Sequence, residues 1–63
     1  MTVHFVMLPM DGGEGQVAVN PGLVRWVQAR NSGQAEIWFD SDLSLVVDKS
    51  IEQVVRDLEI AGR

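Results

Sequence analysis

The stretch that decides the fold is the C-terminal segment 50-SIEQVVRDLEIAGR-63. Ser50 is a favourable N-cap, because its hydroxyl can accept a hydrogen bond from the backbone N–H of Gln53, whose side chain can reach back to Ser50. Gly62 suits the C′ position that ends a helix. The apolar residues between them recur at helical spacing and form one stripe, made by Ile51, Val54, Val55 and Leu58. The segment therefore predicts one amphipathic helix.

A helix of this length is unstable in water by itself, so its stripe must pack on a sheet formed by the rest of the chain. Five segments rich in β-branched and aromatic residues precede it: Thr2–Leu8, Gln16–Asn20, Leu23–Arg30, Ala35–Phe39 and Leu43–Val47. Short connections between them favour antiparallel pairing of consecutive strands. The sequence predicts an α+β fold: a small, strongly curved antiparallel β-meander of about five strands, with the one C-terminal helix across a face or an open end.

Three local patterns refine this prediction. Both faces of Thr2–Leu8 are largely apolar, which favours a central or covered strand. Asn20-Pro21-Gly22 has proline and glycine at the positions that a type II turn prefers, and it should end the second strand. The segments 31–34 and 40–42 are short enough to be hairpin turns on either side of the fourth strand.

Length and composition limit the size of the core. The chain has 63 residues, 46% of them hydrophobic, and no cysteine, so we expect a single domain over residues 1–63 without disulfide bonds. A chain this small hides apolar side chains with difficulty. This composition favours a homo-oligomer or a bound protein partner.

The charge and hydropathy patterns exclude several classes of partner. The net charge is −4, and the five basic residues are scattered, so nucleic acid and anionic membranes are poor partners. No apolar run is long enough to span a bilayer, and the N-terminus lacks the pattern of a signal peptide. We therefore expect a cytoplasmic protein without membrane insertion.

Residues suited to catalysis are sparse. His4 is the single histidine, and no G-x-S-x-G motif surrounds a serine, so we expect no catalytic residues. Asp40-Ser41-Asp42 has too few oxygens at fixed spacing for a calcium loop, and the glycine-rich run 11–15 lacks the lysine of a phosphate-binding loop. These patterns predict a protein that is not an enzyme and that has neither a cofactor nor a metal site.

The two tryptophans are candidates for partner binding. If the third and fourth strands form a hairpin around Ser32, Trp26 lies opposite Trp38 and Gln28 opposite Glu36 on one face. The other face pairs Val27 with Ile37 and Ala29 with Ala35, and we expect it to be the floor for the helix. The indoles then pack on each other or on a loop, or they form an interface with a second copy or another protein. We predict partner binding by Trp26, Trp38, Gln28 and Glu36.

Three segments carry a family resemblance: Val17–Val24, Ile37–Phe39 and Leu45–Val55. Their order of strand, Asn-Pro turn, hairpin and capped helix resembles the small FlbD-like proteins of bacterial flagellar and swarming operons. The resemblance spans residues 16 to 58. It implies a small cytoplasmic protein that supports flagellar motor function, with no catalytic residues to transfer.

These patterns together favour a small, non-enzymatic, protein-binding accessory factor related to flagellar motility. An alternative is an inhibitor encoded by a phage or mobile element that binds a host protein through the tryptophan face. A third possibility is a small ligand-binding or enzymatic subunit that uses His4 and the acidic turn.

Overall fold

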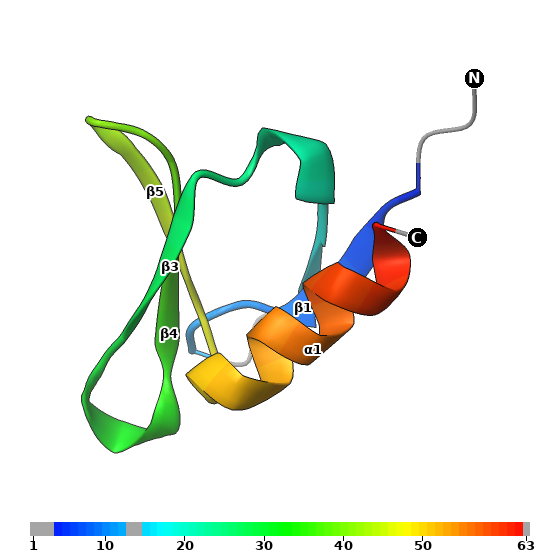
Figure 1. Ribbon diagram of the computed structural model, residues 1–63. Helices are drawn as coiled ribbons and strands as arrows, with labels where there is room; N and C mark the ends of the chain where they lie inside the picture. Colours follow the sequence, from blue (N-terminus) through cyan, green and yellow to red (C-terminus); the bar gives the residue numbers. More distant parts are fainter. Residues whose placement is uncertain (1–3, 13–14, 63) are drawn as a thin grey trace.

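The computed structural model describes residues 4–12 and 15–62 and shows an α+β fold, which confirms the predicted fold class (Figure 1). Among these residues are five strands, two 3-10 turns and one α-helix. In chain order they are β1 (Val6–Pro9), β2 (Gln16–Val19), η1 (Pro21–Leu23), β3 (Trp26–Ala29), η2 (Asn31–Gly33), β4 (Ala35–Asp40), β5 (Leu43–Val47) and α1 (Ile51–Ala61).

The strands are divided between two small antiparallel sheets. One contains β1 and β2, and the other has the order β3–β4–β5. The sheets meet where β1 ends beside β5, through an isolated bridge between Met10 and Val47 and a 2.9 Å hydrogen bond from the Asp48 N–H to the Pro9 carbonyl. Within the described ranges, β2 and β3 do not pair. The meander is therefore open between its second and third strands.

The segment between β2 and β3 explains this opening. The Asn20 side chain accepts a 3.0 Å hydrogen bond from the Gly22 N–H, and the Leu23 N–H donates to the Asn20 carbonyl over 3.1 Å. These bonds hold Pro21–Leu23 in a 3-10 turn, and Gly22 does not adopt a positive φ. The expected type II turn is thus wrong, although the segment does end the strand as predicted. The turn directs the chain away from β2 instead of folding it back alongside.

The first strand is shorter and less covered than expected. Residues 1–3 of the predicted strand lie outside the described residues, and pairing begins only at Val6. Leu8 is fully buried, whereas Phe5 is 59% and Met7 53% exposed. The prediction of a central or covered strand is wrong, because a two-stranded sheet places only one of its faces on the core.

The core draws on both sheets and on the helix. Its buried members are Leu8, Val19, Ala35, Ile37, Val47 and Val54. Helix α1 contacts β1, β3 and η1, so it lies across the open side where β2 and β3 fail to pair (Figure 1). The helix therefore joins two sheets that share few hydrogen bonds with each other.

The start of α1 shows half of the predicted capping box. The Ser50 hydroxyl accepts a 3.3 Å hydrogen bond from the Gln53 N–H, which is the expected N-cap contact, but within the described part of the chain the Gln53 side chain does not bond back to the Ser50 N–H. At the other end, Gly62 has a right-handed φ of −79°, and its N–H donates to the Leu58 carbonyl over 2.9 Å. The helix therefore ends before Gly62 as expected, but Gly62 is the C-cap and does not take the C′ position.

The apolar stripe of α1 is covered unevenly. Val54 is fully buried, and Ile51 and Leu58 pack against the core, but Val55 is 39% exposed. Successive helical residues differ by about 100° around the axis, so Val55 lies well to one side of Val54. The prediction that Val55 faces the sheet is wrong, because the floor offered by these short strands is narrower than the stripe.

Candidate functional site

The candidate site is the face of the β3–β4–β5 sheet that points away from the core, which we term the outer face. In the observed register Trp26 lies opposite Trp38 and Gln28 opposite Glu36, as predicted. Side chains alternate between the faces of a strand, and the intervening residue Ile37 is fully buried. The four predicted partner-binding residues are therefore brought together on one surface.

The two indoles form a stacked pair. Their ring centroids are 5.4 Å apart and the rings are inclined by 12°. Trp26 is 45% exposed, whereas Trp38 is half-buried. Stacking across two strands holds both side chains in defined positions. The result is a rigid aromatic surface beside the polar pair of Gln28 and Glu36.

Trp38 also has an unusual polar atom. Its Nε1 is buried and has no hydrogen-bond partner among the described residues. Burying an indole N–H without an acceptor costs free energy, on the order of 1–3 kcal/mol. At this position an apolar ring of similar shape would therefore avoid a cost that the indole of Trp38 carries.

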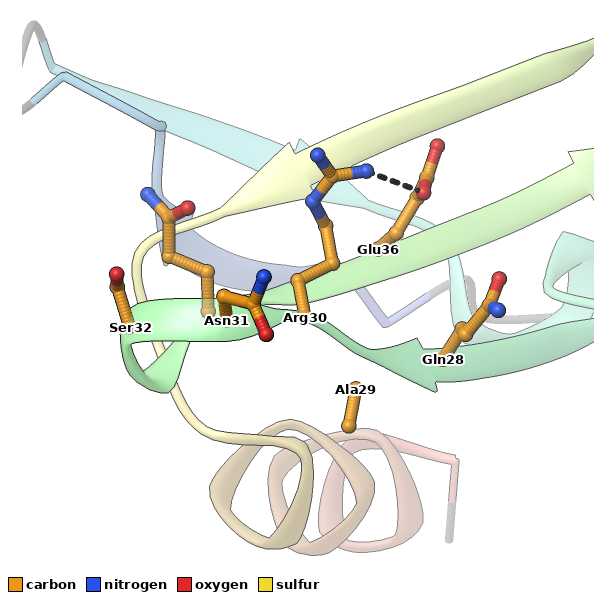
Figure 2. A pocket seen from close by; sticks show the side chains of 7 residues that line it. Gln28, Ala29, Arg30, Asn31, Ser32 and Glu36 are labelled. Atoms are coloured by element: carbon orange, nitrogen blue, oxygen red, sulfur yellow. Dashed lines mark hydrogen bonds and ion pairs between the residues drawn. The ribbon is translucent and has the colours of Figure 1, made fainter.

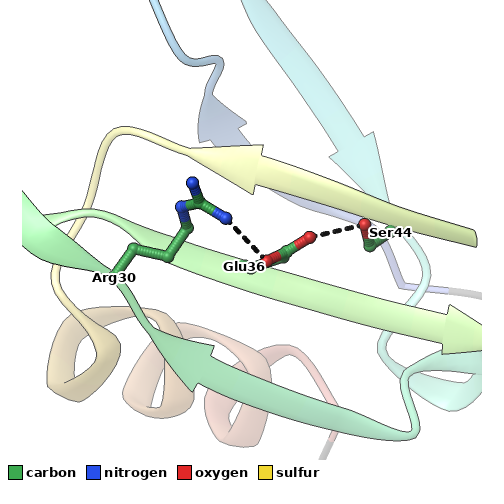
Figure 3. Close-up of polar contacts among 3 residues, drawn as sticks. All are labelled: Arg30, Glu36 and Ser44. Carbon is green, nitrogen blue, oxygen red and sulfur yellow. Dashed lines mark hydrogen bonds and ion pairs between the residues drawn. The ribbon is translucent and has the colours of Figure 1, made fainter.

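Glu36 is the centre of a polar network on this face. Its carboxylate accepts a 2.6 Å hydrogen bond from the Ser44 hydroxyl and pairs with the Arg30 guanidinium over 2.9 Å (Figure 3). The Ser44 bond, and after it the contact with Arg30, hold the pKa of Glu36 below its usual value, against the opposing effect of its desolvation. Glu36 is therefore an oriented carboxylate with its side chain only 14% exposed.

A polar hollow of about 380 Å³ lies at the η2 end of the outer face (Figure 2). Its floor is shaped by η2, where Ser32 and Gly33 both have left-handed φ values, of 65° and 73°. The residues that line it are Gln28, Ala29, Arg30, Asn31, Ser32, Gln34 and Glu36. Gln28 and Glu36 thus line the hollow and also lie next to the aromatic stack.

Sequence reasoning missed Arg30 and Ser44 as neighbours of Glu36. A signal was present, because Arg30 follows Gln28 by two residues on the same face of the predicted hairpin. Ser44 is harder to find, since it depends on a shift of register between Trp38 and Asp40 in the pairing of β4 with β5. Such a bulge changes which residues are neighbours across the strands.

The other residues considered for chemistry are dispersed. His4 precedes β1 and is exposed, and the Ser41 N–H donates to Asp40 Oδ1 over 2.8 Å as part of a hairpin turn. Within residues 4–12 and 15–62, no three histidine or acidic side chains are grouped as metal ligands. The same part of the chain has no helix with the length and apolarity needed to cross a membrane.

Comparisons with known proteins do not assign the chain to a family. No family model matches it, and neither curated proteins nor solved structures provide a match.

Proposed function

We propose that this chain is a small cytoplasmic accessory factor that acts by binding another protein and has no catalytic role. The binding surface is the outer face, with Trp26, Trp38, Gln28 and Glu36 as its main contacts. The observation that carries the proposal is the stacked tryptophan pair, which exposes 45% of Trp26 on the side of the sheet opposite the core.

The physical argument concerns the cost of ordering side chains. Protein interfaces are enriched in tryptophan and arginine, and their main contacts cluster at well-packed centres surrounded by polar groups. Here the two rings are already held by stacking, and Glu36 is held by Arg30 and Ser44. A surface ordered before binding loses less conformational entropy when a partner docks.

Charge favours one kind of partner surface. The chain has nine acidic and five basic residues, and Asp40 and Asp42 lie at the hairpin end of the outer face. A partner surface with an excess of lysine and arginine would be attracted over distance and could place a cation on an exposed indole. We therefore propose a basic protein surface as the partner.

The biological context that we propose is flagellar motility, on the strength of the resemblance of residues 16 to 58 to FlbD-like proteins. Deletion of the gene should then reduce motility without affecting growth, and the wild-type gene should restore it. Normal motility of the deletion strain would refute the flagellar role. The binding proposal would then still be tested separately.

The binding proposal is tested by affinity capture with wild type, Trp26→Ala and Trp38→Ala. The matched control is Ile60→Ala, which also removes an exposed apolar side chain but on α1, away from the outer face. We expect both tryptophan variants to fold, as seen by circular dichroism, and to lose a partner that the control retains. If the folded tryptophan variants retain every partner, the outer face is not the binding surface.

A further inference from the structure

Strand β3 has one edge that pairs with no other strand among the described residues. It pairs only with β4, and the Arg30 N–H donates to the Gln34 carbonyl over 2.9 Å at the end of this hairpin. In an antiparallel pair, hydrogen-bonded positions alternate, so Gln28 and Trp26 also direct their backbone groups toward β4. The N–H and C=O groups of Val27 and Ala29 therefore point to the opposite edge, where no strand pairs within the described parts of the chain.

Between the flanking Arg25 and Arg30, this edge lacks the features that usually prevent strand addition. Natural edge strands are commonly protected by charged residues, by proline or by a bulge. The four residues Trp26–Ala29 include no charge and no proline, and their register with β4 is continuous. Three of the four are exposed, and Val27 is half-buried. Both the backbone and the side chains of β3 are thus accessible to another strand.

We propose that the occupant of this edge is a second copy of the chain, paired antiparallel through β3 about a two-fold axis at Gln28. In this register Val27 lies opposite Ala29 of the partner subunit, and each such pair exchanges two backbone hydrogen bonds. Gln28 then faces Gln28 of the partner subunit at a position without backbone bonds, where side chains are closest. The two three-stranded sheets become one sheet of six strands.

The side chains of β3 are complementary to themselves in this register. Trp26 lies opposite Arg30 of the partner subunit in this register, and because the Arg30 guanidinium is paired with Glu36 of its own chain, no like charges meet across the axis. Arg30 is extended, with φ −120° and ψ 171°, so its backbone is compatible with continued pairing. The two glutamine amides at the axis can each donate to and accept from the other. The proposed dimer shares Trp26 and Gln28 with the proposed binding surface, and it would join two outer faces into one continuous surface.

A single cysteine tests the register directly, because the chain contains none. Cα atoms opposite each other at such a position are about 4.5–5.5 Å apart, which is suitable for a disulfide. Gln28→Cys should therefore form an intermolecular disulfide rapidly under mild oxidation. Ser44→Cys, on β5 of the same face, is the matched control and should react far more slowly. Equal rates for the two variants would overturn the proposed pairing.

The mass in solution tests the association itself. Sedimentation equilibrium of the wild type over a concentration series should give twice the chain mass of 7.0 kDa. Gln28→Lys should shift the mass to that of the monomer, because it places two like charges at the axis, while the introduced ammonium group is stabilised within each chain by Glu36 opposite it. Ser44→Lys, also beside Glu36, should remain a dimer. A monomeric wild type, or a dimer that Gln28→Lys leaves intact, would refute the inference, whatever the outcome of affinity capture.

Discussion

The inner and outer faces of the β3–β4–β5 sheet differ in how their side chains are held. On the inner face, Ala35, Ile37 and Val47 are fully buried and pack with Val54 of α1. On the outer face, Trp26 and Trp38 stack on each other, and Glu36 is held by Arg30 and Ser44. One face is ordered by burial against distant parts of the chain, and the other by contacts across neighbouring strands.

This difference determines which face of the sheet contributes most to the stability of the fold. Hydrophobic burial on the inner face is the main favourable term in folding, so its loss should be costly. Contacts on the outer face are partly exposed, and each contributes less to the free energy of unfolding. A small domain can therefore carry a preordered surface on a sheet whose other face provides most of its stability.

The largest effect should come from a charge on the inner side. Val54→Asp introduces a carboxylate at a fully buried position and should cost several kcal/mol, on the order of the whole stability of a domain this small. Val55→Asp is the matched control, with its position 39% exposed, and should cost less than about 1 kcal/mol. Urea unfolding followed by circular dichroism measures both. Similar losses for the two variants would show that α1 is oriented differently.

The next largest loss of stability is expected at Ile37, and its neighbour Trp38 on the opposite face of β4 provides the comparison. Ile37→Ala should cost about 2–5 kcal/mol, because it leaves a cavity in the core. Trp38→Phe keeps an aromatic ring for stacking and removes the buried N–H without a partner, so it should be within about 1 kcal/mol of wild type or slightly more stable. Thermal unfolding of both variants makes the comparison. A large loss for Trp38→Phe would mean that the outer face contributes to stability as strongly as the core.

A smaller effect is expected at the N-terminus of α1, which docks on the inner side. Ser50→Ala removes the acceptor for the Gln53 N–H and should cost about 1 kcal/mol. Ser50→Asp retains an acceptor at the N-cap and should preserve most of the stability. Denaturant midpoints distinguish the two variants, and equal midpoints for Ser50→Ala and wild type would show that the cap is not formed in solution.

The smallest effect is a pH dependence of the outer face. Because the pKa of Glu36 is lowered in the folded state, its contribution to stability is present above the unfolded pKa and is lost as pH falls through the folded pKa. Glu36→Gln should therefore be less stable than wild type at neutral pH, and the difference should shrink below about pH 4. Melting temperatures over this range test the sign. A difference that grows on acidification would contradict the network described for Glu36.

Local patterns predicted much of this structure. The limits of β5, the Ser50 cap and the register of Trp26 with Trp38 all follow from short-range features: a periodicity, a hydroxyl at an N-cap and a short hairpin connection. Two largely apolar faces did not make β1 a covered strand, because the burial of a strand depends on how many elements pack beside it. The position of Ser44 next to Glu36 required a bulge that the alternation of side chains does not reveal.

The sequence by itself determined the order of strands and helix, the helix cap and the faces of β3 and β4. Each of these depends on interactions over a few residues, with the backbone periods of 2 and 3.6 setting which side chains share a face. Only the tertiary structure decided that the meander opens between β2 and β3, that α1 closes this opening, and that Val54 rather than Val55 reaches the core. These outcomes depend on how much surface distant segments can cover together, and no single segment contains that information.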